Sequence, residues 1–316
     1  MNVSSPQPVL VSLTPVVLLI VLGFVVGRLQ WIRDSAVRDL SNLVFLVLIP
    51  ALLFRTMSSV RVQQLDTLPL LVYFSAAFVL FGLVLAFQGF HRRGVALALA
   101  SVFSNTVMIG IPLVELAYGT EGLVTLLTLV SVHALVLLTV ITIVFELAVA
   151  REARAAGQGA SSLWGTAWGA VKSTVIHPIP LPILCGLLYA QTGWALPVVV
   201  DKPLQLLANA FGPIALLLVG VTMSRTRVTG LWRDTLLVTL LKNLALPACV
   251  GLSGWLWGLQ GLPWTVMVVS AALPVGANVF LFAQRYQVAE DLVTASVGVT
   301  TAAALLSLTA VIWLIS

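Results

Sequence analysis

Two short stretches of the chain place amide and hydroxyl side chains beside helix-breaking residues, inside otherwise apolar runs. The residues are Ser104, Asn105 and Thr106 in the first stretch, and Pro274, Val275, Gly276 and Asn278 in the second. A proline lacks the amide hydrogen and clashes with the preceding turn, and a glycine adds backbone freedom, so helices tend to be interrupted there. An interruption leaves backbone groups unpaired, which lipid tolerates only where protein or water surrounds them. The two stretches therefore predict a polar island at membrane depth.

The chemistry of such an island favours anions. Backbone amides at the start of a helix carry partial positive charge and bind anions without any cationic side chain. Asn105 and Asn278 would add side-chain donors and acceptors. Interrupted segments in corresponding positions of two halves are the best sequence pointer to the binding site of a secondary transporter. The alternative interpretation is a pair of ordinary kinks, in which each asparagine bonds to a neighbouring helix.

Ionisable residues inside the apolar runs are few. His133 lies in the middle of one run and is a candidate substrate-binding residue, because an ionisable group inside the membrane is a functional hypothesis by default. The alternative is a neutral histidine that bonds to a neighbouring helix. Lys242 lies nine residues past Arg233, and we expect a structural lysine that can still extend its ammonium group toward the interface. On this reading the polar island itself carries no cation.

The composition requires lipid as the solvent of the folded chain. Of 316 residues, 60% are apolar and 9% are charged, against roughly 45–50% and about 25% in a globular domain. A helix needs about 20 mostly apolar residues to span a bilayer. Ten runs qualify, at residues 9–27, 40–57, 67–89, 94–117, 122–149, 175–193, 203–223, 234–258, 263–284 and 290–315. The sequence therefore predicts an all-α polytopic membrane protein with ten transmembrane helices.

The basic residues set the orientation. Cytoplasmic loops of membrane proteins are enriched in lysine and arginine. In the ten-span arrangement, twelve of the sixteen basic residues fall in loops on one side and three on the other, with Lys242 inside a span. We therefore expect both termini on the extracytoplasmic side of a bacterial inner membrane. The net charge of +5 is explained by these loops, and no nucleic-acid partner is expected.

Sequence features of the first half of the chain recur in the second half. We divide it into a first five-helix repeat at residues 1–150, a cytoplasmic linker at 151–170 and a second repeat at 171–316. Pro15 and Gly23 in the first span recur as Pro178 and Gly186, an offset of 163 residues. Because five is odd, the second half must enter the membrane from the opposite side, which gives an inverted repeat. Inverted repeats are common in secondary transporters.

Four stretches resemble the auxin efflux carrier family, which includes bacterial malonate-type transporters and plant auxin carriers. They cover residues 15–27, 41–54, 104–119 and 272–296, in order along nearly the whole chain. The third and fourth are the specific ones; the third reads Ser-Asn-Thr-Val-Met-Ile-Gly-Ile-Pro from Ser104 to Pro112, and the fourth contains Pro274, Tyr286 and Asp291.

The resemblance implies a fold of two inverted five-helix repeats in which broken helices 4 and 9 cross. A substrate carboxylate would lie near the crossing, in contact with Asn105 and Asn278. One part of the chain would be a scaffold and the other a moving transport domain. The chain departs from the plant members at Ser104, where they carry proline. His133 falls where plant relatives carry a polar residue near the substrate.

The function expected from the sequence is secondary active or facilitative transport of a small organic anion such as a mono- or dicarboxylate. The alternative is a sodium- or proton-coupled antiporter or symporter of related fold for a different solute. A proton-coupled cation antiporter would need an acidic residue at the crossing, and Glu115 is about 15 Å away along a helix. H⁺ or Na⁺ coupling and a homodimer stay open. The sequence contains no zinc-protease or serine-hydrolase motif, so we expect no enzyme activity, no metal site and no cofactor.

Overall fold

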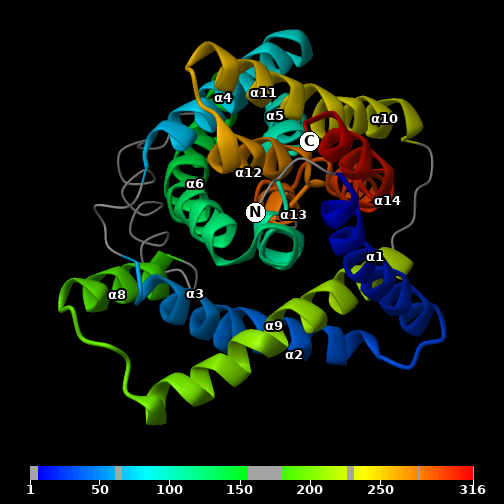
Figure 1. Cartoon of the computed structure of the whole chain (residues 1–316). Coiled ribbons are helices and arrows are strands. Elements are labelled where there is room, and N and C mark those ends of the chain that lie inside the picture. The colour runs from blue at the N-terminus through cyan, green and yellow to red at the C-terminus, as the bar shows by residue number, and fades with distance from the viewer. Residues whose placement is uncertain (1–5, 61–65, 156–179, 226–230, 277, 316) are drawn as a thin grey trace.

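The computed structural model of the chain describes residues 6–60, 66–155, 180–225, 231–276 and 278–315 (Figure 1). Within these ranges every regular element is a helix, as the sequence predicts. The first half contains α1 (Pro6–Arg28), α2 (Asp34–Leu43), η1 (Val44–Leu48), α3 (Ile49–Met57), α4 (Leu68–Gln88), α5 (Arg92–Val102), η3 (Thr106–Gly110) and α6 (Ile111–Ala155). The second contains α8 (Pro180–Gln191), α9 (Val198–Arg225), α10 (Trp232–Leu240), η4 (Leu241–Ala245), α11 (Leu246–Leu256), α12 (Gly261–Ala272), α13 (Asn278–Arg285) and α14 (Glu290–Ile315).

The described helices overlap the predicted apolar runs, although the runs at 94–117 and 263–284 are interrupted and α6 extends from the first of these into the run at 122–149. Among the described residues, six helical stretches are long and apolar enough to cross a membrane, and three shorter helices are apolar. Many outward-facing side chains are large and apolar, such as Leu188 and Leu306, which suits contact with lipid. Helix α6 turns at Gly119, whose φ of 63° is accessible to glycine. It also continues into the predicted linker as far as Ala155, whereas residues 156–170 and Pro178 lie outside the described part.

Three segments, η1, η3 and η4, are π-helices, and each ends two residues before a proline. The prolines are Pro50, Pro112 and Pro247. Because proline removes one hydrogen bond and crowds the carbonyl four residues earlier, the preceding turn widens. Short π segments inside α-helices occur frequently at functional sites.

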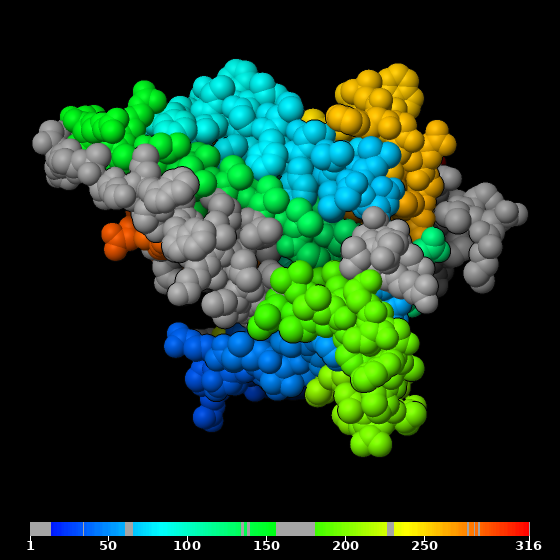
Figure 2. Space-filling model, turned by 90° about the vertical axis from the view of Figure 1, so that its left-hand side faces the viewer, coloured from blue at the N-terminus to red at the C-terminus, as the bar shows by residue number. Residues whose placement is uncertain are grey.

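The helices pack as two groups. Helices α1, α2, α3, α8 and α9, with η1, pack on one another and form the first group, at the bottom of Figure 1. The remaining helices form the second group above it, and the side view separates the same two groups (Figure 2). Each group therefore combines segments from both halves of the sequence.

Each ion pair formed by the described residues joins two helices of the same group. In the first, Arg55 of α3 binds Asp201 of α9, with Nε and Oδ1 2.7 Å apart. In the second, Arg92 of α5 binds Glu152 of α6 at 2.6 Å. Burial would raise the pKa of the Glu152 carboxyl, but hydrogen bonds from Arg92 and the charges of Arg92 and His91 hold that pKa below its usual value. These contacts tie each group together without joining the two.

Glycines allow the closest helix contacts in the first group. A Cβ atom at Gly23 of α1 would collide with the carbonyl oxygen of Leu217 of α9. A Cβ atom at Gly186 of α8 would lie 2.7 Å from the carbonyl oxygen of Phe54 of α3. The two glycines are 163 residues apart, and so are Phe54 and Leu217. The contact of α1 with α9 is thus repeated by α8 with α3, as a two-fold relation between the halves would produce.

We expect Gly23→Ala to destabilise the protein by about 1–3 kcal/mol, because the new methyl group meets backbone that cannot rotate away. The measurement is the thermal unfolding midpoint in detergent. Gly251→Ala is the matched control, since its Cβ would have no neighbour closer than 3.8 Å and alanine favours the helix. Equal midpoints for the two variants would contradict the close packing of α1 on α9.

Candidate functional site

The two stretches singled out in the sequence meet in space. Helix α5 ends at Val102 and η3 begins at Thr106, while α12 ends at Ala272 and α13 begins at Asn278. Between these ends the extended segments 103–105 and 274–276 lie antiparallel, and we call the pair the junction. The amide of Asn105 donates to the carbonyl of Pro274 at 2.8 Å, and the amide of Gly276 donates to the carbonyl of Phe103 at 2.9 Å. Each interruption thus satisfies backbone groups of the other.

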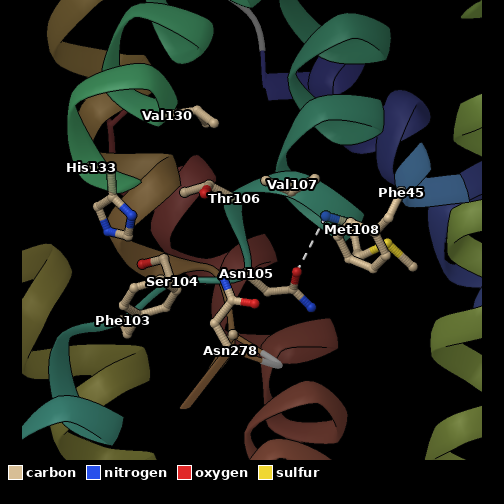
Figure 3. Close-up of a pocket in the computed structure, with 11 residues that line it drawn as sticks. Phe45, Phe103, Ser104, Asn105, Thr106, Val107, Met108, Val130, His133 and Asn278 are labelled. Carbon is tan, nitrogen blue, oxygen red and sulfur yellow. Dashed lines mark hydrogen bonds between the residues drawn. The ribbon is translucent and has the colours of Figure 1, made fainter. Parts of the chain in front are cut away.

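Side chains around the junction satisfy further backbone groups. Asn105 Oδ1 accepts a hydrogen bond from the amide of Met108, at 3.2 Å, and so caps the restarting helix (Figure 3). Ser104 Oγ lies 3.0 Å from the hydroxyl of Tyr73. The amide of Val275 donates to Oγ1 of Thr300 at 3.1 Å. These contacts explain why the chain unwinds at residues 103–105 without a proline.

A small cavity opens beside the junction (Figure 3). Its lining includes six of the eight predicted binding residues: Ser104, Asn105, Thr106, His133, Gly276 and Asn278. The other two, Pro274 and Val275, pair the backbone of the junction and are not part of the lining. Among the described residues of the lining, none carries a carboxylate or a cationic side chain. Its polar surface therefore consists of amides, hydroxyls, backbone and one imidazole.

The cavity lies between the two groups of helices. Phe45 of η1 belongs to the first group, and the other lining residues belong to the second. The cavity volume is about 40 Å³, which holds only a few water molecules, whereas ligand pockets measure roughly 300–1,000 Å³. A solute much larger than water does not fit the cavity as it stands in this structure.

His133 lies beside the junction in an aromatic cluster. Its side chain is 3% exposed, and its ring centroid lies 4.7 Å from that of Phe103 and 5.8 Å from that of Tyr73. Its Nε2 atom has no hydrogen-bond partner among the described residues. A buried polar atom without a partner costs about 1–3 kcal/mol. His133 thus combines a place in the cavity lining with an unused hydrogen-bonding atom.

We expect His133→Phe to raise the thermal unfolding midpoint and to lower transport at least about tenfold. The phenyl ring suits the aromatic surroundings and removes the unpaired nitrogen, but it offers no hydrogen bond to a solute. Both properties are measured on the same purified protein, before and after reconstitution. Unchanged transport would mean that His133 has no part in the site.

Lys242 corrects one prediction. The lysine does not extend to the interface: it is completely buried, and its Nζ atom donates to the carbonyls of Ala271, at 2.6 Å, and Leu273, at 2.5 Å. Both carbonyls lie at the end of α12, next to the junction. The described lining of the polar island carries no cation, as expected, but an ammonium group lies directly behind the junction. Snorkelling requires an open path along the helix surface, and α12 and the junction close it here.

Glu115 lies away from the junction. It lines a different cavity, of about 520 Å³, together with Arg55 and Asp201. A carboxylate at this distance does not suit proton-coupled cation exchange at the junction, as the sequence indicated. The described residues also contain no group of three or more histidine, cysteine, aspartate or glutamate side chains that could hold a metal ion.

Two aromatic residues near the site escaped the sequence reasoning. Tyr73 reaches Ser104 from α4, and Phe45 faces the cavity from η1. Both lie in apolar runs where an aromatic side chain carries no special signal. The proline that follows η1, Pro50, is the only local mark of the widened turn that holds Phe45.

Comparison with known proteins decides the family. A family model described as membrane transport protein matches residues 8–312, nearly the whole chain. The chain belongs to the auxin efflux carrier family of membrane transport proteins. It is accordingly a multi-pass membrane transporter and not an enzyme.

Relatives of this carrier come from bacteria, archaea and plants. A Rhizobium meliloti protein named "Putative malonate transporter" is 26% identical over 304 residues, covering 94% of this chain and 92% of the relative. Auxin efflux carrier component 8 of Arabidopsis thaliana is 24% identical over 238 residues, covering 62% of this chain and 64% of the relative. The uncharacterized transporter YfdV of Escherichia coli K12 is 24% identical, with 92% of each chain covered.

Proposed function

We propose that this carrier transports a small organic anion, a mono- or dicarboxylate, which binds at the junction. The observation that carries the proposal is the meeting of two interrupted helices beside a cavity lined by amides, hydroxyls and an imidazole, without a carboxylate. The helix that restarts at Thr106 and α13, which starts at Asn278, both begin there. Their N-terminal amides favour an anion.

The name of the Rhizobium meliloti relative makes malonate the first carboxylate to test. Free side-chain atoms support a polar ligand. Asn105 uses Oδ1 to cap its helix, which leaves its amide nitrogen to donate. Asn278, at the start of α13, is half-buried in the cavity wall.

We further propose alternating access within ten membrane spans arranged as two inverted repeats, at residues 1–150 and 171–316. The matching glycine contacts and the reciprocal hydrogen bonds of the junction support a two-fold relation between the repeats. The cavity between the two groups supports movement of one group against the other. The distribution of basic residues supports an arrangement with both termini on the extracytoplasmic side of a bacterial inner membrane.

A sodium- or proton-coupled carrier of another solute is the second candidate. Two hydroxyls near the junction already bond to the protein. Thr300 Oγ1 donates to the carbonyl of Ser296 and accepts from the amide of Val275, and Ser131 Oγ donates to the carbonyl of Leu127. The bond that Thr300 Oγ1 accepts uses a lone pair that Na⁺ would need, which makes this hydroxyl a poorer sodium ligand.

The test is transport by the purified protein in liposomes. Currents and uptake are recorded for malonate, other dicarboxylates, monocarboxylates, and amines and neutral solutes of matched size. We expect saturable transport of at least one carboxylate, and its loss in Asn105→Ala. Transport of amines or neutral solutes without any carboxylate would overturn the proposal.

A further inference from the structure

Lys242 is a completely buried amine in the interior of the second group. It lies in η4, the widened turn before Pro247, and its Nζ atom donates to the carbonyls of Ala271 and Leu273. Leu273 precedes Pro274, whose carbonyl accepts from Asn105. A single residue therefore separates the lysine's contact from the backbone pairing of the junction.

The carbonyls that Lys242 contacts lie at the C-terminal end of a broken helix. Such an end carries partial negative charge, and in secondary transporters the carbonyls of half-helix C-termini coordinate the coupling cation. Here an ammonium group occupies that position. A lysine side chain, unlike Na⁺, stays attached to the protein throughout the transport cycle.

Among the described residues, Lys242 has no carboxylate as a counter-ion. None of the ion pairs formed by the described residues includes it. A buried charge without a partner is costly, and two carbonyls with a helix dipole compensate only part of that cost. The Leu273 carbonyl that Lys242 contacts adjoins the junction, and the cavity opens beside the junction. An anion bound in the cavity would supply the missing partner.

The corresponding helix of the first half makes a different contact. Tyr73 of α4 reaches Ser104 on its own side of the junction, as Lys242 of η4 reaches Leu273 on the other. One half therefore places a neutral hydroxyl at the junction, and the other places an amine. The hydroxyl contacts a side chain and the amine contacts backbone carbonyls, so the two halves support the junction differently.

We propose that Lys242 is a built-in cation that replaces a coupling Na⁺ and balances the charge of the bound carboxylate. The proposal rests on the proposed function. Because Lys242 and most of the cavity wall belong to the second group, the positive charge accompanies the substrate when one group moves against the other. Na⁺ is then not needed for binding or transport.

The first test separates charge from hydrogen bonding. Lys242→Gln keeps N–H donors and loses the charge, whereas Lys242→Met loses both. Affinity for the transported carboxylate is measured by calorimetry on protein that elutes as the wild type does on size exclusion. Both variants should bind the carboxylate at least about tenfold more weakly. This is the loss of affinity expected when the attraction between two opposite unit charges roughly 10 Å apart, at an effective dielectric constant of about 20, is removed. If Lys242→Gln bound the carboxylate with wild-type affinity, Lys242 would serve only as a hydrogen-bond donor to the end of α12, and the proposal would be overturned.

The second test needs no variant, and decides the matter if the variants do not fold. Wild-type transport of the same carboxylate is compared in sodium and in N-methylglucamine buffers. Equal rates support a built-in cation, and a requirement for Na⁺ overturns it. Failure of this inference is distinct from failure of the proposed function, because either test begins only once a carboxylate has been shown to bind or to be transported.

Discussion

Asn105→Asp is expected to abolish carboxylate transport while the protein stays folded. The aspartate can still accept the hydrogen bond from the Met108 amide that Asn105 accepts now, and aspartate is as good a helix cap as asparagine. It also places a negative charge in the cavity. At roughly 5 Å and an effective dielectric constant of about 20, two like charges repel by about 3 kcal/mol, more than a hundredfold in affinity.

The measurement is the rate of carboxylate uptake into liposomes, with the unfolding midpoint recorded alongside. Asn209→Asp is the matched control, because it makes the same chemical change in the larger cavity that contains Glu115, and it should retain most of the transport. If Asn105→Asp transported a carboxylate as well as the wild type does, no anion would bind beside Asn105.

Gly276→Val should reduce transport on the order of a hundredfold. A Cβ atom at this position would lie 2.8 Å from the ring of Phe103 and 3.0 Å from the carbonyl oxygen of Ser104. The ring can turn, but the carbonyl is backbone of the junction. The two segments must therefore separate, which strains the hydrogen bond from Gly276 to Phe103. A displacement of a binding group by about 1 Å lowers the rate by about a hundredfold.

Gly82→Val provides the comparison for this second prediction. A Cβ atom at Gly82 would have no neighbour within 4 Å, so the same change on α4 should leave transport near the wild-type rate. Uptake by both variants is normalised to the amount of protein in the liposomes. Equal uptake would show that close packing at the junction does not matter for transport.

The helices were predictable because lipid imposes one solution on a long apolar run. The described residues of each run are helical apart from a few residues at run ends and the interruptions at the junction, and the interruption at Pro274 and Gly276 follows from their backbone chemistry. The interruption at Ser104 has no such local cause. It depends on bonds from Asn105 to Pro274 and from Ser104 to Tyr73, partners far away in the sequence. Matching the two halves, and not local propensity, indicated its position.

The environment of Lys242 could not be predicted for a related reason. Whether a lysine in a membrane helix reaches the interface depends on what packs around it, and hydropathy contains no information about neighbours. The proline after η4 marked a widened turn, but nothing local indicated that the carbonyls of α12 would receive the ammonium group. Phe45 was missed similarly, because it faces the cavity only through packing between the groups.

The most direct measurement of the central claim is substrate protection of a single cysteine in the cavity wall. Val107→Cys places a thiol of similar size among the lining residues, in a chain whose two native cysteines, Cys185 and Cys249, have been replaced by serine and alanine. Thr125→Cys, in a separate cavity, is the control. The rate of labelling by N-ethylmaleimide is measured with and without the transported carboxylate. A carboxylate bound at the junction predicts labelling at least about fivefold slower at position 107 and unchanged at 125; the reverse pattern, or equal slowing at both, would contradict it.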